Sequence, residues 1–107
     1  METPPKELDG AEVVYYVVLS DKHHRTGAYR HYVDGQLIGP VPALAICRYA
    51  GDEEAYLFHC DSHWRVITDD LFASVDDAIE QAGVQYEGLE KGDWIPYVVA
   101  DSERTAT

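Results

Sequence analysis

Cysteine is scarce in this sequence, in which Cys47 and Cys60 are the only two among 107 residues. Two cysteines are too few for the disulfide framework of a small secreted domain, so we expect both thiols to be free in a reducing compartment. Long apolar runs are also missing, and without 18 consecutive apolar residues the sequence predicts no transmembrane helix. The polar N-terminal residues lack the apolar segment of a secretory signal. Together these absences predict a cytoplasmic protein.

Basic residues are few as well. Eight Lys and Arg stand against 20 Asp and Glu, which gives a formal net charge of −12. A field of this sign repels the phosphates of nucleic acids and anionic membranes, so neither is an expected partner. The same field attracts and steers a basic protein, which is therefore the partner class that the charge favours. Solubility alone also accounts for the excess of acids.

The length of the chain predicts one domain with a core of moderate size. Pro4, Pro5 and Gly10 lie among charged residues near the start, and polar residues make up the end. We expect a flexible N-terminal arm over residues 1–11, a single α+β domain over residues 12–99 and a disordered tail over residues 100–107.

Apolar and β-branched runs predict several strands. Residues 12–20 are apolar on both faces, which is typical of a central strand. Residues 28–33 and 36–38 flank Asp34-Gly35, a pair that favours a type I′ hairpin turn. Further strands are expected over residues 43–50, 56–60 and 65–68. In the simplest register of the second hairpin, Cys47 lies opposite Cys60 on one face of the sheet.

A helix follows the strands. Ser74 is a suitable N-cap with Asp77 three residues later, and Gly88 is a suitable residue beyond the C-terminus. The spacing of the apolar residues Val75, Ala78, Ile79, Ala82 and Tyr86 predicts one buried helix face. The adjacent acids Asp69-Asp70 and Asp76-Asp77 are interpreted as charges that favour the start of this helix.

The fold class predicted is α+β: an antiparallel β-meander of about 4 to 6 strands with one C-terminal amphipathic helix packed on one face. One helix covers about two strands, so a second apolar sheet face needs another cover. A symmetric homodimer is the first choice for that cover, and a different protein partner is the second. The aromatic residues expected at the interface are Tyr15, Tyr49, Tyr56, Phe58, Trp64 and Trp94.

The segment YLFHCDSHWRVITD and the helix after it resemble a family of small bacterial proteins to which no activity is assigned. The shared pattern is an apolar strand ending in Cys-Asp, a turn to Trp, a strand ending in Thr-Asp, and a helix ending in Tyr-x-Gly. Its positions are Cys60, Asp61, Trp64, Thr68, Asp69, Ser74, Ala78, Gln81, Ala82, Tyr86 and Gly88. The resemblance covers about a third of the chain and implies a bacterial cytoplasmic protein with a strand–helix core.

The densest group of possible metal ligands is His59, Cys60 and His63, which His23-His24 would complete. His59 and Cys60 are adjacent on a strand and should point to opposite faces, which favours a buried structural Cys beside solvent-facing His. A catalytic Cys60 with His63 and Asp61 is the enzymatic alternative, but no glycine-rich oxyanion site accompanies it. No cofactor is expected.

These observations favour a non-enzymatic protein–protein interaction module that acts as a homodimer. The alternative is a small enzyme, or a metal- or ligand-binding domain, that uses the turn from Cys60 to His63.

Overall fold

The computed structural model describes residues 1–27 and 30–98, in which ten strands, one α-helix and one 3-10 helix occur. In chain order the elements are β1 (Glu7–Leu8), β2 (Ala11–Val18), β3 (His24–Arg25), β4 (Tyr32–Val33), β5 (Gln36–Leu37), β6 (Ala43–Arg48), β7 (Ala55–Cys60), β8 (Val66–Phe72), α1 (Val75–Gln85), β9 (Tyr86–Glu87), η1 (Lys91–Asp93) and β10 (Ile95–Pro96).

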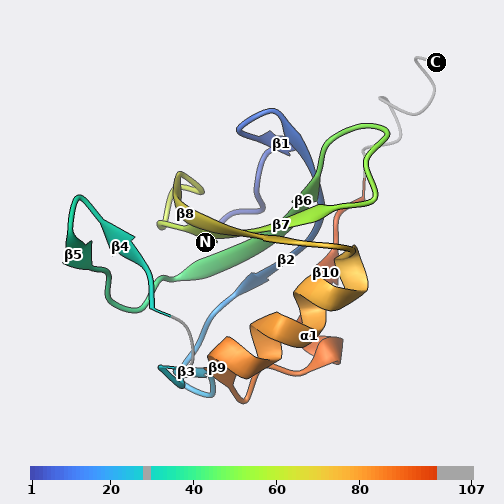
Figure 1. Ribbon diagram of the computed structural model, residues 1–107. Helices are drawn as coiled ribbons and strands as arrows, with labels where there is room; N and C mark the ends of the chain where they lie inside the picture. The colour runs from blue at the N-terminus through green and yellow to red at the C-terminus, as the bar shows by residue number, and fades with distance from the viewer. Residues whose placement is uncertain (28–29, 99–107) are drawn as a thin grey trace.

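The main sheet is antiparallel and curled, with the strands in the order β1-β2-β6-β7-β8 (Figure 1). β10 pairs with β2 at Tyr15 and Tyr16, further along the same strand that β1 joins at its start. β3 pairs with β9, and β4 pairs with β5, in two small separate ladders. The predicted α+β class, with one C-terminal helix on one sheet face, is therefore confirmed.

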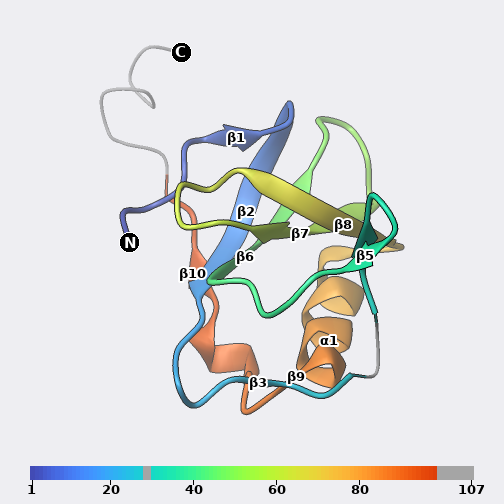
Figure 2. The same ribbon diagram turned by 90° about the vertical axis from the view of Figure 1, so that its left-hand side faces the viewer.

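Helix α1 packs against β6, β7 and β8 (Figure 2). Ser74 caps it as predicted, since its Oγ accepts a hydrogen bond from the Asp77 N–H at 3.1 Å. Ala78 and Ala82 on the predicted apolar face are fully buried. Gly88 ends the segment with a φ of 85°, and a Cβ there would collide with the carbonyl group of Lys22.

Two apolar clusters lie on opposite faces of the sheet. The first, beneath the helix, contains Leu44, Ile46, Leu57 and Trp94. The second contains Leu8, Ala11, Val13, Ala43, Ala45, Cys47, Phe58, Cys60 and Trp64. Trp64 Nε1 donates a hydrogen bond to the Glu2 carbonyl at 2.8 Å, which fixes the N-terminal segment over this face. The second face is thus covered by the chain itself, through the curl of the sheet and residues before β2.

The predicted register of the hairpin β6–β7 is wrong. Cys47 pairs with Tyr56, and Cys60 pairs with Ala43, so the two thiols are not cross-strand partners. The loop is therefore longer than the four residues on which that prediction relied. Both cysteines still lie on one face, in the second cluster.

Strand β8 is longer than predicted. It continues through Asp69 and Asp70 to Phe72, so these two acids do not begin the helix. Asp is unfavourable in strands, but Asp70 is held there by hydrogen bonds from His59 and Gln85. Asp76 and Asp77 do lie in the first helical turn, as the interpretation of the second acidic pair requires.

The N-terminal segment and the hairpin β4–β5 also form paired strands. Part of the predicted arm, Glu7–Leu8, forms β1, and Leu8 is buried. The turn between β4 and β5 has positive φ angles at both Asp34 and Gly35, as a type I′ turn requires. The predicted tail, residues 100–107, lies outside the described residues.

Candidate metal centre

His31, His59 and Asp70 form a cluster on the helix side of the sheet. The register of β7 and β8 pairs His59 with Thr68, so Asp70 lies two residues further along on the same face. Diagonal neighbours of this kind are within reach of long side chains. His31 comes from the segment just before β4, and its ring lies 4.3 Å from that of His59, measured between centroids. Residues from three separate segments therefore meet at one point.

The two imidazoles present the same nitrogen to the same oxygen. Nε2 of His59 lies 3.1 Å from Oδ2 of Asp70, and Nε2 of His31 lies 3.4 Å from it. The three ligand atoms are all within 4.8 Å of one another. Nitrogen and oxygen ligands about 2.0–2.1 Å from a tetrahedral zinc ion are roughly 3.3–3.4 Å apart. The separation of His31 from Asp70 falls in this range, and that of His59 from Asp70 is slightly shorter, at hydrogen-bond length.

Each histidine also has an outer partner, and Gln85 donates to the same Asp70 oxygen that the two imidazoles face. Nδ1 of His31 lies 3.4 Å from Thr68 Oγ1, and Nδ1 of His59 lies 3.4 Å from the Tyr86 hydroxyl. Gln85 Nε2 donates a hydrogen bond to Asp70 Oδ2 at 3.1 Å. Metal-binding imidazoles use one ring nitrogen for the ion and the other for a partner that fixes the ring. Both histidines have this arrangement, with Nε2 directed inward and Nδ1 held by a hydroxyl.

Nε2 of His31 is the exception to the satisfied groups around it. The atom is buried and makes no hydrogen bond with any described residue, because its contact with Asp70 at 3.4 Å lacks hydrogen-bond geometry. A buried polar atom without a partner costs about 1–3 kcal/mol. Such an atom in a native structure is usually explained by contact with an ion or a water molecule.

Burial and hydrogen bonds shift the pKa values of His59 and Asp70. Burial lowers the pKa of His59, and the charge of Arg25 acts in the same direction, against the hydrogen bond with Asp70. Burial acts to raise the pKa of Asp70, but hydrogen bonds from His59 and Gln85 outweigh it and hold that pKa below its ordinary value. A neutral imidazole and an ionised carboxylate are the forms that bind metals.

The turn from Cys60 to His63 has a different structure. Cys60 is buried, its Sγ contacts the Phe58 carbonyl at 3.8 Å, and burial raises the pKa of its thiol to about 12. Asp61 accepts hydrogen bonds from the backbone N–H groups of His63 and Arg65 at 2.8 and 2.9 Å. These contacts lower the pKa of Asp61 and close the turn. The carboxylate thus orients the backbone, and the side chain of His63 is exposed.

The other candidate ligands are also placed by the fold. His23 accepts a hydrogen bond from the Ser20 N–H at Nδ1, and its Nε2 lies 3.2 Å from Asp93. His24 is exposed on β3. Of the histidines and cysteines considered from the sequence, only His59 belongs to the buried cluster.

The aromatic residues expected at an interface fall into two groups. Phe58, Trp64 and Trp94 are buried within the chain. Tyr15 and Tyr56 are half-buried, and Tyr49, whose hydroxyl donates to the Asp9 carbonyl, is exposed. Most of this aromatic surface therefore packs in the two cores of the protein.

Sequence reasoning missed His31, Asp70 and Gln85. The apolar residues Leu71 and Phe72 were a signal that the strand continues beyond Thr68. A strand extended in this way would have placed Asp70 beside His59. No pattern in the sequence marks His31, because its position depends on the path of the chain between β3 and β4.

Comparison with known protein families, curated proteins and solved structures finds no match to this chain. The resemblance to a family of small bacterial proteins therefore stays a prediction. Neither helix of the described residues is long and apolar enough to cross a membrane.

Proposed function

We propose that this protein binds one divalent transition-metal ion through His31, His59 and Asp70. The observation that carries the proposal is the buried Nε2 of His31, which has no hydrogen-bond partner among the described residues and lies beside the carboxylate oxygen that His59 also contacts. An ion between these three atoms would give His31 the partner that it lacks.

The donor set determines the class of metal. Imidazole suits zinc, copper, iron and nickel, whereas magnesium and calcium prefer oxygen ligands alone. Two neutral imidazoles and one carboxylate carry a single negative charge, which partly neutralises a divalent ion. The proposal retains the metal-binding alternative drawn from the sequence but moves it from the turn of Cys60 and His63 to the cluster around His59.

Calorimetric titration of the metal-free protein with zinc tests the proposal. We expect one ion per chain, and a stabilisation of about 2.7 kcal/mol when free zinc is 100 times the dissociation constant. His31→Ala and Asp70→Asn should each remove this binding. His63→Ala is the matched control, because His63 is exposed and lies in the turn after β7. Binding that is lost in His63→Ala but retained in His31→Ala would contradict the proposal.

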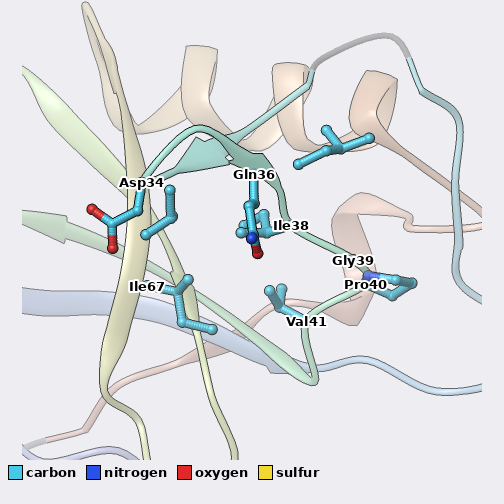
Figure 3. A pocket seen from close by; sticks show the side chains of 9 residues that line it. Asp34, Gln36, Ile38, Gly39, Pro40, Val41 and Ile67 are labelled. Carbon is cyan, nitrogen blue, oxygen red and sulfur yellow. The ribbon is translucent and has the colours of Figure 1, made fainter.

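A second candidate function is the protein–protein interaction predicted from the sequence. Its support is exposed apolar surface around β8 and the hairpin β4–β5, at Tyr32, Leu37, Ile67 and Leu71. A cavity of about 580 Å³ lies between the hairpin and β8, with Ile38, Val41 and Ile67 among its walls and Asp34 at its edge (Figure 3). β8 also ends the sheet, so its outer backbone groups have no strand partner among the described residues.

The partner that fits this edge is an extended basic segment. The exposed Asp69 lies at the centre of β8 between Ile67 and Leu71. A lysine on an added strand would be attracted to it, whereas a second copy of β8 would bring a like charge opposite. A peptide of alternating Val and Lys should shift the amide resonances of β8, and Asp69→Lys should remove this effect while Glu53→Lys retains it. Equal binding of a Val and Glu peptide would contradict the candidate.

The homodimer and the cytoplasmic location also stay predictions. A dimer no longer needs to cover the second sheet face, because Leu8, Phe58 and Trp64 fill it within one chain. Light scattering distinguishes a monomer of 12.0 kDa from twice that mass.

A further inference from the structure

The proposed metal centre has three protein ligands. Within the described part of the chain, the group of ligand atoms contains His31, His59 and Asp70 and no fourth His, Cys, Asp or Glu. Structural zinc sites are closed by four protein ligands, whereas sites with three keep one position for water or a bound molecule. The ligand count therefore places this centre in the open class.

Asp70 is the most exposed of the three proposed ligands. The side chains of His31 and His59 are 7% and 2% exposed, whereas that of Asp70 is 23% exposed. An ion held here would therefore be reached on the side of Asp70, because both imidazoles are buried. Since only part of Asp70 is exposed, such access suits a small molecule rather than a large one.

The charges around the centre favour an anion. A divalent ion with the single negative charge of Asp70 leaves one net positive charge. Arg25 adds another, because β3 pairs Arg25 with Tyr86, whose hydroxyl contacts His59. Arg25 Nη1 donates to the Ile38 carbonyl at 2.7 Å, and among the described residues it has no carboxylate within ion-pair distance. With the ion bound, the site would therefore carry an excess of positive charge, in a chain whose net charge is −12.

From these observations we propose that the ion held by His31, His59 and Asp70 keeps one exchangeable coordination position, and that a small carboxylate anion takes it. The anion displaces a water molecule from the ion, with no covalent bond in the protein formed or broken. The guanidinium group of Arg25 attracts the anion by its charge. This inference rests on the proposed metal-binding function.

Cobalt provides the test, since it replaces zinc in nitrogen and oxygen sites and its visible absorption depends on the number and type of ligands. The full chain is loaded with Co²⁺ and titrated with sodium formate, with sodium perchlorate holding the ionic strength constant. We expect a saturable change in the cobalt absorption that fits one site. Arg25→Gln should weaken formate binding at least about fivefold, which corresponds to a coupling of about 1 kcal/mol, and should leave the affinity for Co²⁺ itself within about twofold.

Two further variants control for the fold and for general charge. Arg25→Lys retains the charge, so it should bind formate within about twofold of the unmodified protein. Arg65→Gln removes a positive charge that is exposed and paired with Asp61, and it should have no effect.

The outcomes separate this inference from the function on which it rests. A protein that binds Co²⁺ but whose spectrum does not respond to formate overturns the exchangeable position and leaves the metal site intact. Equal formate binding by Arg25→Gln overturns the role of the positive charge. A protein that binds no Co²⁺ overturns both proposals.

Discussion

His59 and Asp70 lie on neighbouring antiparallel strands, with Nε2 of the histidine 3.1 Å from Oδ2 of the carboxylate. His31 adds a second Nε2 at 3.4 Å from the same oxygen. One carboxylate oxygen therefore faces two imidazoles and the amide of Gln85. These polar groups lie beside the apolar core beneath the helix, to which Tyr86 belongs.

Replacing His31 by Leu should remove metal binding without lowering the stability of the folded protein. Nε2 of His31 is buried without a hydrogen bond, so the metal-free variant should match or exceed the unmodified protein in free energy of unfolding, within about 1 kcal/mol. His59→Leu should instead destabilise by about 1–3 kcal/mol, because Asp70 loses a donor while it remains partly buried. Urea denaturation of both variants in a chelating buffer measures the difference. A His31→Leu protein as unstable as His59→Leu would show that His31 has a structural role.

Replacing Tyr86 by Phe removes only a hydroxyl. That hydroxyl lies 3.4 Å from Nδ1 of His59 and is the outer partner of the ring. Loss of such partners usually lowers metal affinity by about 10–100-fold. Competition with a chelator of known zinc affinity measures the change. Tyr97→Phe is the control, because Tyr97 packs on the opposite face of the sheet, and an equal effect in both variants would contradict the role of Tyr86.

Both thiols should resist modification in the folded protein. Burial raises the pKa of Cys60 to about 12 and also raises that of Cys47, so at pH 8 neither forms much thiolate. An aromatic disulfide reagent at pH 8 should therefore react only as fast as the protein unfolds locally. In urea, which unfolds the chain, the reagent should label two thiols per chain without delay. Rapid labelling of one thiol in the native protein would contradict this arrangement and would restore Cys60 as a candidate nucleophile.

The stabilisation that Asp93 provides should be lost in acid. Its carboxylate accepts hydrogen bonds from the Glu90 N–H, the Lys22 ammonium and His23, which lower its pKa well below the ordinary value. A group with a lowered folded pKa stabilises above its unfolded pKa of about 3.9, and this stabilisation is lost as the pH falls below it. Asp93→Asn should therefore be less stable than the unmodified protein at pH 6, and the difference should shrink below about pH 4. A difference that is constant from pH 2 to pH 6 would contradict this role.

The fold was largely predictable from local chemistry. Ser74, the spacing of Ala78 and Ala82, and the Asp34-Gly35 turn each specify their own structure through neighbouring residues. The register of β6 and β7 was not predictable, because it depends on the length of a polar loop between Arg48 and Ala55 that no periodicity fixes. The cover of the second face depended on the curl of the sheet, a property of the assembled strands.

The candidate site was less accessible to sequence reasoning. The turn with Cys60 and His63 is dense in reactive residues along the chain, but strand alternation separates the side chains of neighbours. His59, beside that turn, instead contacts Asp70, eleven positions later, and His31, which lies just before β4. Sites of this kind are assembled by tertiary contacts, so a correct end for β8 would have indicated His59 and Asp70 but not His31.

A crystal grown with zinc and measured on both sides of the zinc absorption edge would show the proposed metal site itself. We expect one strong anomalous peak per chain, about 2.0–2.2 Å from Nε2 of His31, Nε2 of His59 and a carboxylate oxygen of Asp70. No peak at this position, or a peak at His63 or His24 alone, would contradict this expectation.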